Sequence, residues 1–295
     1  MCCTGCSIPG RVNANVQTDM TSIAHHRRFY ANFIVSSAGS KDQRLIDAFA
    51  AVPRENYVGD GPWPIFVGSG YLPTISSDPA LLYQDVLVGL DQERGINNGQ
   101  PTLHARCLAA VAPAPGETVV HIGAGTGYYT AVLATLVGPA GRVIAYEIEA
   151  DLATRARRNL AQFKNVEVVA ASASAGALPE TDVIYVNAGA THPLGSWLDA
   201  LRIGGRLIFP LTPDEGFGCM LLVTRKGATA FAAQALMRVA FIPCTGARDV
   251  AASAALTTAL ALHSLQGVKS LHRGTAPDAS AWCVGTGWWL SSTPP

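Results

Sequence analysis

The stretch from Val119 to Ala134, VVHIGAGTGYYTAVLA, constrains the fold more than any other part of this 295-residue chain. Residues 118–122 are short, β-branched and apolar, which predicts a strand buried on both faces. Three glycines follow, and residues 126–137 then carry apolar side chains at the spacing of a helix with one buried face. A strand, a glycine turn and a helix bring backbone N–H groups and a positive helix end to a polar or anionic ligand.

Regular alternation of strands and helices continues after Gly116. The pattern predicts strands at 118–122, 142–147, 166–170, 182–187, 205–211 and 219–225, and helices near 126–137, 149–163 and 193–202. Repeated strand, helix and strand units with nearly all-apolar strands indicate an α/β fold. Its sheet is expected to be doubly wound and mostly parallel, with helices on both faces.

The flanking segments suggest four parts of the chain. We expect a disordered extension at 1–19, an N-terminal helical and loop cover on the substrate side at 20–112, the glycine-turn domain at 113–245, and a C-terminal helix-plus-strand extension at 246–295. The cover includes a helix near 41–52 that ends before a proline. In the extension, Trp282, Trp288 and Trp289 are interpreted as packing residues.

Charge and cysteine usage narrow the function classes. Twenty-one basic residues balance 21 acidic ones, and no basic run exceeds a pair, so neither a nucleic acid nor an anionic membrane is the expected partner. No apolar stretch reaches the ~18 residues of a membrane helix, and the start lacks a secretory signal, so a cytoplasmic location is expected. Cys2, Cys3 and Cys6 precede any periodic segment and the other four cysteines are scattered, so no metal site is predicted.

The spacing of the glycines separates two classes of ligand. A dinucleotide fingerprint needs a third glycine three residues after the second, where this chain has Tyr128. Gly123, Gly125 and Gly127 instead form GxGxG, the version associated with S-adenosylmethionine. A nicotinamide-dependent dehydrogenase is therefore a disfavoured alternative.

Glu147 supports the prediction of a ligand that contains a ribose. It ends the apolar run RVIAYE, and a carboxylate at a strand tip can accept hydrogen bonds from both hydroxyls of a ribose. The alternative is an acidic residue at a helix N-terminus, but Glu149 and Asp151 already fill that role.

The order of several segments resembles the protein-L-isoaspartate O-methyltransferases. The segments are AFAAVPRENYV, NNGQPTLHARCLAAV, VVHIGAGTGYYTAVLA, VIAYEIEADLATRARRNL, DVIYVNAGA and LRIGGRLIFPL, and FIPCTG looks like that family's late strand. The resemblance spans roughly residues 41–245. It implies a Rossmann-like methyltransferase fold, S-adenosyl-L-methionine as cofactor with S-adenosyl-L-homocysteine as product, and repair of isoaspartyl residues. The predicted cofactor-binding residues are Gly123, Ala124, Gly125, Gly127, Glu147, Ile148, Ser172, Ala173 and Asn187.

Three positions depart from the family's pattern. The family usually has Thr-Ile-Ser-Gln-Pro before the first sheet strand, with the serine close to the methyl-transfer site, and here Gly99 stands at the serine position. The family's aspartate near the adenine corresponds to Ser172, which bonds an amino group more weakly than a carboxylate. The acid that usually opens the glycine motif is His121. Weaker cofactor binding or a relocated adenine contact is the expected consequence.

The nature of the nucleophile decides which residues catalyse. A carboxylate is already deprotonated and needs no base, so Asn97, Asn98 or Gln100 would only have to position its oxygen. A hydroxyl or amine needs a base, for which His104 is the candidate, although a buried structural histidine is the alternative reading. His192, which follows the fourth strand of the predicted sheet, is equally a base or a loop residue. The predicted catalytic residues are Asn98, Gln100 and His104.

Three functions follow from these observations. The first is methylation of a carboxylate on a peptide, a protein or a related substrate. The second is a small-molecule O- or N-methyltransferase with His104 or His192 as base. The third is a binding protein that kept the fold without the chemistry, which Gly99 and Ser172 motivate. The sequence leaves the methyl acceptor and the oligomeric state open.

Overall fold

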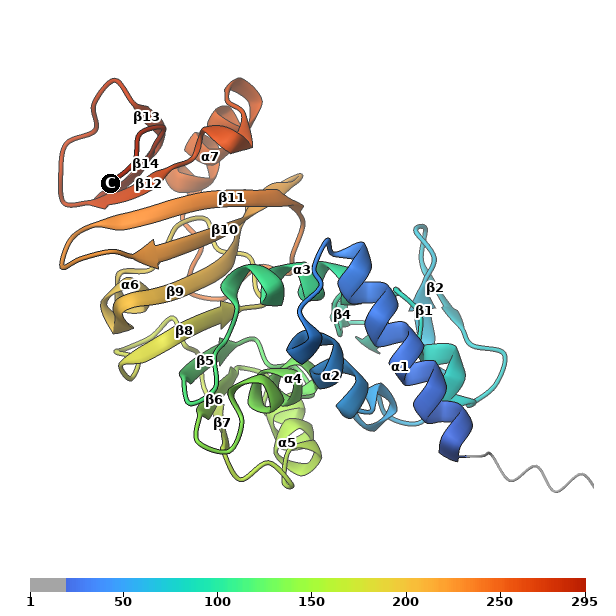
Figure 1. Ribbon diagram of the computed structural model, residues 1–295. Helices are drawn as coiled ribbons and strands as arrows, with labels where there is room; N and C mark the ends of the chain where they lie inside the picture. Colours follow the sequence, from blue (N-terminus) through green and yellow to red (C-terminus); the bar gives the residue numbers. More distant parts are fainter. Residues whose placement is uncertain (1–19) are drawn as a thin grey trace, which may run out of the picture.

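The computed structural model of the protein describes residues 20–295 (Figure 1). Its helices are α1 (Met20–Ser37), α2 (Gln43–Ala51), α3 (Pro101–Val111), α4 (Tyr128–Val137), α5 (Ala150–Asn159), α6 (Gly195–Ala200) and α7 (Val250–Leu262), with short 3-10 turns η1 (Arg54–Tyr57), η2 (Pro79–Leu82) and η3 (Leu265–Gly267). Two small hairpins pair β1 (Pro64–Phe66) with β2 (Tyr71–Pro73), and β3 (Gly89–Asp91) with β4 (Ile96–Asn97). The N-terminal cysteine cluster and the extension predicted at 1–19 lie outside the described residues.

One ten-stranded sheet organises the molecule, in the order β13-β14-β12-β11-β10-β9-β8-β5-β6-β7. Its strands are β5 (Thr118–Ile122), β6 (Arg142–Glu147), β7 (Val166–Ala170), β8 (Thr181–Val186), β9 (Leu201–Leu211), β10 (Gly218–Arg225), β11 (Phe231–Val239), β12 (Ser270–Arg273), β13 (Ala281–Gly285) and β14 (Trp288–Ser291). The strands from β7 through β9 pair in parallel, and those from β10 onward pair antiparallel. The predicted doubly wound α/β class is confirmed, and the antiparallel strands extend the sheet on one side.

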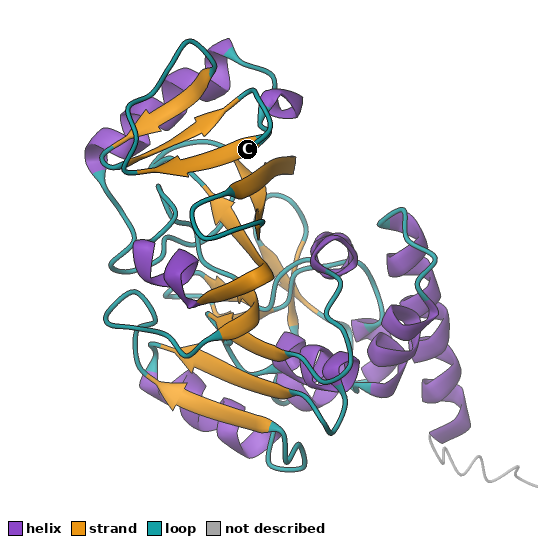
Figure 2. Ribbon diagram, turned by 60° about the vertical axis from the view of Figure 1, so that its left-hand side comes forward, coloured by secondary structure: helices purple, strands orange, loops and turns teal. Residues whose placement is uncertain are grey.

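Helices cover the sheet on both sides, as Figure 2 shows. Helices α3, α4 and α5 pack on one face, where the core includes Leu133 and Tyr185, and α1 and α2 pack on α3 and α4 outside them. Helices α6 and α7 pack on the other face, where the core includes Val120, Trp197 and Leu256. Both faces of β5 are buried, since its adjacent residues point into different cores, and this explains its continuous apolar run.

The predicted elements differ from the structure mainly at helix ends. Strands β5, β6 and β7 have the expected bounds. Helix α6 is shorter than the predicted 193–202, because Leu201 already pairs with Thr181 as the start of β9. Helix α5 ends at Asn159 rather than 163, where Asn159 donates a side-chain hydrogen bond to the carbonyl of Thr126.

The segment FIPCTG is not the late strand that its resemblance suggested. Strand β11 ends at Val239, and residues 241–246 cross the end of the sheet as a loop. This loop is bonded to Gly189, whose N–H donates to Ile242 O and whose carbonyl accepts from Cys244 N, both over 2.8 Å. Pro243 has no N–H for a ladder, so the pairing there is limited to one bridge.

The C-terminal extension completes the sheet instead of forming a separate layer. Strands β12 to β14 continue the sheet beyond β11, and α7 covers their inner face. Trp282 and Trp288 are buried in that core, and Trp289 stacks on His272 with ring centroids 4.1 Å apart. The predicted packing role of the three tryptophans is confirmed.

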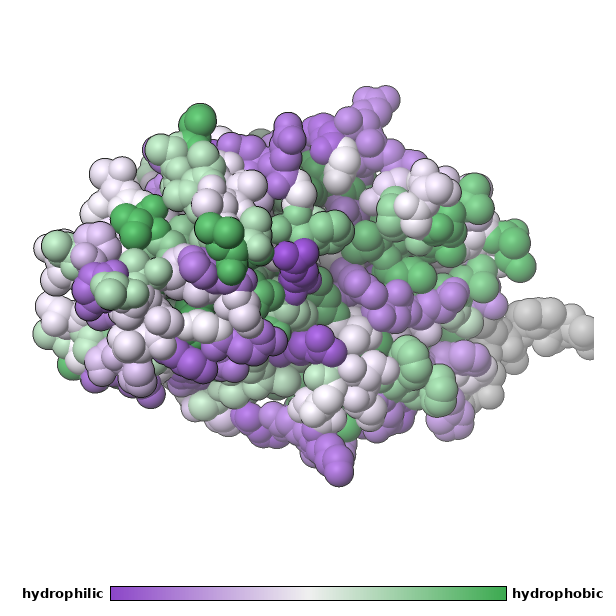
Figure 3. Space-filling view, turned by 90° about the horizontal axis from the view of Figure 1, so that it is seen from above, coloured by the Kyte–Doolittle hydropathy of each residue, from purple (hydrophilic) through white to green (hydrophobic). Residues whose placement is uncertain are grey.

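Residues 20–112, predicted as the N-terminal cover, comprise α1, α2, α3, the 3-10 turns η1 and η2 and the two small hairpins. Several large apolar side chains of this cover are exposed, among them Phe29, Phe33, Leu72 and Ile75. Seen from above, hydrophobic residues lie on the side of the molecule that carries this cover, while the rest of that view is mixed (Figure 3). Within residues 20–295 no helix is long and apolar enough to cross a membrane.

Candidate active site

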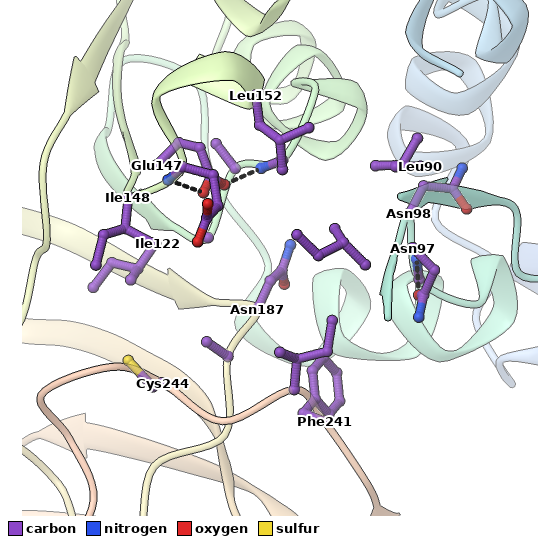
Figure 4. A pocket seen from close by; sticks show the side chains of 18 of the residues that line it. Leu90, Asn97, Asn98, Ile122, Glu147, Ile148, Leu152, Asn187, Phe241 and Cys244 are labelled. Carbon is purple, nitrogen blue, oxygen red and sulfur yellow. Dashed lines mark hydrogen bonds between the residues drawn. The ribbon is translucent and has the colours of Figure 1, made fainter. Parts of the chain in front are cut away.

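A cavity of about 840 Å³ lies at the carboxyl ends of β5, β6 and β8, beneath the N-terminal cover. This is the edge of a doubly wound sheet where ligands bind, and the volume is that of a small-molecule site. Figure 4 shows side chains from the end of β6, the end of β8 and strand β4 arranged around it. The predicted residues that line it are Asn98, Gln100, His104, Gly123, Ala124, Gly125, Glu147, Ile148, Ser172, Ala173 and Asn187.

The glycine turn after β5 needs glycine for two different reasons. Gly123, Gly125 and Gly127 all have positive φ, at 75°, 57° and 97°, which other residues adopt at a cost. A Cβ on Gly127 would also lie 2.7 Å from Cδ1 of Leu160, so this glycine permits close packing against the end of α5. A Cβ on Gly125 meets only Leu90, at 3.8 Å, and otherwise points into open space. Gly127 does not line the cavity, whereas Gly123 and Gly125 do.

Glu147 ends β6 beside this turn and is only 6% exposed. Its Oε2 accepts a hydrogen bond from Gly125 N over 2.6 Å, and its Oε1 accepts one from Glu149 N over 3.0 Å (Figure 4). Burial raises the pKa of the carboxyl, while these backbone donors partly offset that rise. Each oxygen keeps further acceptor capacity on the side of the cavity, which fits a ligand that offers two hydroxyl donors.

His121, at the position of the family's acid, is completely buried within β5. Its Nδ1 lies 2.8 Å from Thr130 Oγ1, and the Asn187 Nδ2 donates to its Nε2 over 2.9 Å. Because Nε2 is the acceptor, the ring proton resides on Nδ1 and is donated to Thr130. Burial lowers the pKa of His121 to about 3, so the ring is neutral and orients Asn187 at the cavity wall.

His104 lies on α3 and is 2% exposed. Its Nδ1 lies 2.8 Å from the Tyr185 hydroxyl, and its ring stacks on Tyr129 with centroids 3.7 Å apart and planes inclined by 20°. Burial, with smaller contributions from His121 and Arg54, lowers the pKa of His104 to about 3. A group with such a pKa is a weak base near neutral pH.

Asn98 and Gln100 flank Gly99 on the loop before α3. Asn98 is 8% exposed, and its Oδ1 accepts from Val88 N over 3.0 Å and from Arg54 Nη2 over 3.2 Å. Its buried Nδ2 has no hydrogen-bond partner within the described part of the chain. Gln100 donates from Nε2 to the carboxylate of Asp85 over 3.1 Å. The Asn98 amide is thus turned toward Arg54 and Val88, with an enclosed Nδ2, and the amide of Gln100 is bonded to Asp85.

The position of the family's adenine-binding aspartate carries a hydroxyl that is already in a network. Ser172 Oγ lies 2.7 Å from Ser174 Oγ, which in turn donates to the carbonyl of Thr245 over 2.8 Å. The carbonyl of Ala173 accepts from Trp197 Nε1 over 3.0 Å. The serine bonds connect the loop after β7 to the loop 241–246, while the bond to Trp197 connects it to α6, and both loops line this end of the cavity.

His192 lies apart from the cavity. It is not among the lining residues, and its Nδ1 lies 3.0 Å from the hydroxyl of the adjacent Thr191. Partial burial lowers its pKa. The structure therefore favours the reading of His192 as a loop residue.

Several lining residues were not identified from the sequence. They include Leu90, Arg94, Tyr129, Leu152, Phe241 and Cys244. Arg94 lies at the turn of the β3–β4 hairpin and bonds Glu149 and Asp151, at the start of α5, over 2.7 Å each. These ion pairs hold the β3–β4 hairpin above the glycine turn. Glu149 and Asp151 are more than 50 residues away from Arg94 along the chain, so no local pattern indicates these two ion pairs.

Comparisons with known proteins agree with this geometry. The family model described as protein-L-isoaspartate(D-aspartate) O-methyltransferase (PCMT) matches residues 34–249. The chain is 32% identical over 235 residues to Protein-L-isoaspartate O-methyltransferase 1 of Rhodopseudomonas palustris, covering 78% of this chain and 87% of the relative. It is 31% identical over 236 residues to Protein-L-isoaspartate O-methyltransferase of Methylorubrum populi, covering 76% and 96%.

Two solved structures share the fold. A protein-L-isoaspartate O-methyltransferase superimposes with a TM-score of 0.60 at 25% identity, covering 74% of this chain and 66% of the other. A putative protein-L-isoaspartate O-methyltransferase from Plasmodium falciparum, in complex with S-adenosyl-L-homocysteine, gives a TM-score of 0.60 at 20% identity, covering 75% and 98%. The second likeness is evidence for the fold alone.

Proposed function

The chain belongs to the protein-L-isoaspartate(D-aspartate) O-methyltransferase family and is an S-adenosylmethionine-dependent methyltransferase, and we propose that its methyl acceptor is the carboxylate of an isoaspartyl residue in a peptide or protein. The observation that carries this is Glu147, a buried carboxylate beside the glycine turn with acceptor capacity left on both oxygens. Four buried free thiols, Cys107, Cys219, Cys244 and Cys283, support a reducing, cytoplasmic location as part of the proposal.

The residues around the cavity fit the cofactor. Glu147 would accept the hydroxyls of the ribose, Gly125 leaves room for the ligand to approach the backbone, and Ile148, which is 48% exposed, offers an apolar surface for the adenine. Ser172 and Asn187 would supply polar contacts at either end. When bound, S-adenosylmethionine supplies an electrophilic methyl group: a C–O bond to the acceptor forms as the C–S bond breaks, and the electron pair stays on sulfur.

A carboxylate acceptor suits this cavity because it brings its own negative charge. Such an oxygen needs alignment and no proton transfer, and alignment alone supplies a large part of the rate in displacements of this kind. We assign Asn98, together with His104, to the acceptor side of the cavity.

The two alternatives are not favoured. A hydroxyl or amine acceptor would need a base, but the pKa of His104 is lowered to about 3 and His192 lies outside the cavity. A binding protein without catalytic activity is motivated only by Gly99 and Ser172. The other predicted cofactor-binding residues at the cavity, among them Gly125 and Glu147, are in place. A dinucleotide is disfavoured as well, since Tyr128 at the third-glycine position is a buried packing residue at the start of α4.

The proposal is tested by titration and by methyl transfer. Calorimetry with S-adenosylmethionine and S-adenosylhomocysteine should show micromolar binding. Glu147→Gln should weaken binding about tenfold or more, because hydrogen bonds to a charged group contribute ~1.5–3 kcal/mol each. The matched control is Glu167→Gln, an exposed acid on the next strand, which should bind as the wild type does.

Methyl transfer should then be measured on a peptide containing isoaspartate, with the same peptide containing aspartate as control. Labelling of the isoaspartyl peptide alone supports the acceptor proposed here. Cofactor binding without labelling of that peptide would refute it.

A further inference from the structure

Gly99 and His104 share one volume at the acceptor side of the cavity. Gly99 has a φ of 75°, and a Cβ built on it would overlap Nε2 of His104 and lie 2.7 Å from Cδ2. Such distances do not occur between real atoms, so a side chain at position 99 and this placement of the imidazole exclude each other. The imidazole occupies the space that the missing side chain would need.

The imidazole is fixed in this place on three sides. Nδ1 is bonded to the Tyr185 hydroxyl, Tyr129 stacks on one face, and the ring of Phe241 approaches at an angle of 76° with centroids 6.4 Å apart. Nε2 is the remaining polar atom of the ring. It has no hydrogen-bond partner among residues 20–295, and it points toward Gly99 where both residues line the cavity.

We propose that His104 presents its Nε2–H to the acceptor carboxylate and so performs the positioning that a polar side chain at position 99 would otherwise perform. This inference rests on the proposed function, since it assumes a carboxylate acceptor. It adds a substrate-contacting residue that stands on α3 rather than on the loop before it.

The surroundings of the ring fit a donor on Nε2. When the Tyr185 hydroxyl donates to Nδ1, the ring proton resides on Nε2. Burial is the main cause that opposes a second proton, and the Arg54 guanidinium adds to it, so the ring stays neutral. A neutral N–H orients a carboxylate oxygen, whereas an imidazolium would also stabilise the negative charge that the nucleophile loses during the reaction.

A purely structural histidine would behave differently. Its replacement would lower stability and would affect the binding of cofactor and of acceptor alike. A substrate-contacting Nε2 instead changes the KM for the acceptor and leaves the Kd for the cofactor unchanged. His104→Phe separates the two, because it keeps an aromatic ring against Tyr129 and removes both nitrogens.

The experiment is steady-state methylation of an isoaspartyl peptide by wild type, His104→Phe and His104→Gln, with the Kd for S-adenosylhomocysteine measured on each. We expect His104→Phe to raise the KM for the peptide about tenfold, with an unchanged Kd, and His104→Gln, which keeps an N–H donor, to recover part of the loss. An unchanged KM in a folded, active His104→Phe variant would overturn the inference and leave the proposed function standing. A wild-type enzyme that binds cofactor but does not methylate the peptide would overturn both.

A second measurement uses only the wild-type enzyme, so it does not depend on whether a variant folds. In wild type with ¹⁵N-labelled histidine and saturating S-adenosylhomocysteine, the His104 ring should show a protonated Nε2 and an unprotonated Nδ1. Adding the isoaspartyl peptide should shift the Nε2–H resonance, whereas the aspartyl peptide should not. A proton on Nδ1, or an Nε2–H resonance whose chemical shift does not change when the isoaspartyl peptide is added, contradicts the assignment.

Discussion

The side-chain amide of Asn187 donates to Nε2 of His121 over 2.9 Å and so connects the carboxyl ends of the two central parallel strands. His121 is itself bonded to Thr130 on α4, so strand, helix and cavity wall are joined by one buried chain of hydrogen bonds. The histidine is therefore not an inert replacement for an acid. It sets which way the amide of Asn187 faces.

His121→Phe should weaken cofactor binding several-fold, because it leaves the amide of Asn187 without its partner. Loss of a buried hydrogen bond with one group left unpaired costs about 1–3 kcal/mol, so the variant should also unfold at a lower temperature. His121→Gln can still accept from Asn187 and donate to Thr130, and is expected to bind nearly as the wild type does. Calorimetry and thermal unfolding of the two variants decide this, and equal affinities would contradict it.

Stability should fall in mild acid because of the two buried histidines. The pKa values of His104 and His121 are lowered from 6.5 to about 3 in the folded protein. Below about pH 6.5 these histidines therefore bind protons in the unfolded chain but not in the native state, and stability is lost as the pH falls toward 3. The free energy of unfolding, measured by urea denaturation, should be lower at pH 5 than at pH 7.5. The decrease should be smaller in His121→Gln, and a pH-independent value would refute the neutral assignment.

The two glycines of the turn should give different defects. Gly127→Ala places a Cβ 2.7 Å from Leu160 at a φ of 97°, so it should lower the unfolding temperature and affect binding only through stability. Gly125→Ala meets no atom closer than 3.8 Å but points to where a ligand would lie, so it should weaken cofactor binding more than it destabilises the fold. Melting curves with and without S-adenosylhomocysteine separate these effects. The reverse order would mean that Gly127 is the residue that contacts the cofactor.

The hairpin β3–β4 should be held over the cofactor site by Arg94. Arg94→Gln removes the ion pairs to Glu149 and Asp151. Because these groups are exposed and screened by solvent, the ion pairs hold the hairpin only weakly. The Kd for S-adenosylhomocysteine should therefore rise only about two- to fivefold, mainly through faster dissociation. The wild-type affinity should decrease with salt toward that of the variant. The control is Arg142→Gln, whose pair with Glu167 lies away from the cavity.

The sequence was informative where a local pattern fixes local geometry. Strands β5, β6 and β7 are continuous apolar runs, and the end of β6 places Glu147 beside the turn by strand length alone. Pairing between distant segments was not predictable in this way. The segment FIPCTG resembles the family's late strand in sequence, but Pro243 has no N–H to donate, and the bonds of Ile242 and Cys244 to Gly189 keep the loop 241–246 outside the ladder.

The role of His104 shows the same limit at the site. A histidine five residues after a glycine has no recognisable spacing in a sequence, since the contact exists only because α3 starts at Pro101 and turns the ring back toward the loop. The low pKa also depends on burial between α3, α4 and β8, which the sequence does not reveal. Candidate residues were therefore easier to identify than the protonation states that decide their chemistry.

Restoring a side chain at position 99 should succeed only when the imidazole is removed. Gly99→Ser alone places a Cβ into His104 at a positive φ, so we expect lower stability and at least tenfold lower activity on the isoaspartyl peptide. His104→Ala alone opens a cavity and removes Nε2–H. In the double variant the serine side chain has room, and its hydroxyl can bond the acceptor carboxylate. Activity should therefore exceed the product of the two single effects by about tenfold, which is the mark of residues that share one site. Activities that multiply independently would mean that Gly99 and His104 do not compete for the same volume in the working enzyme.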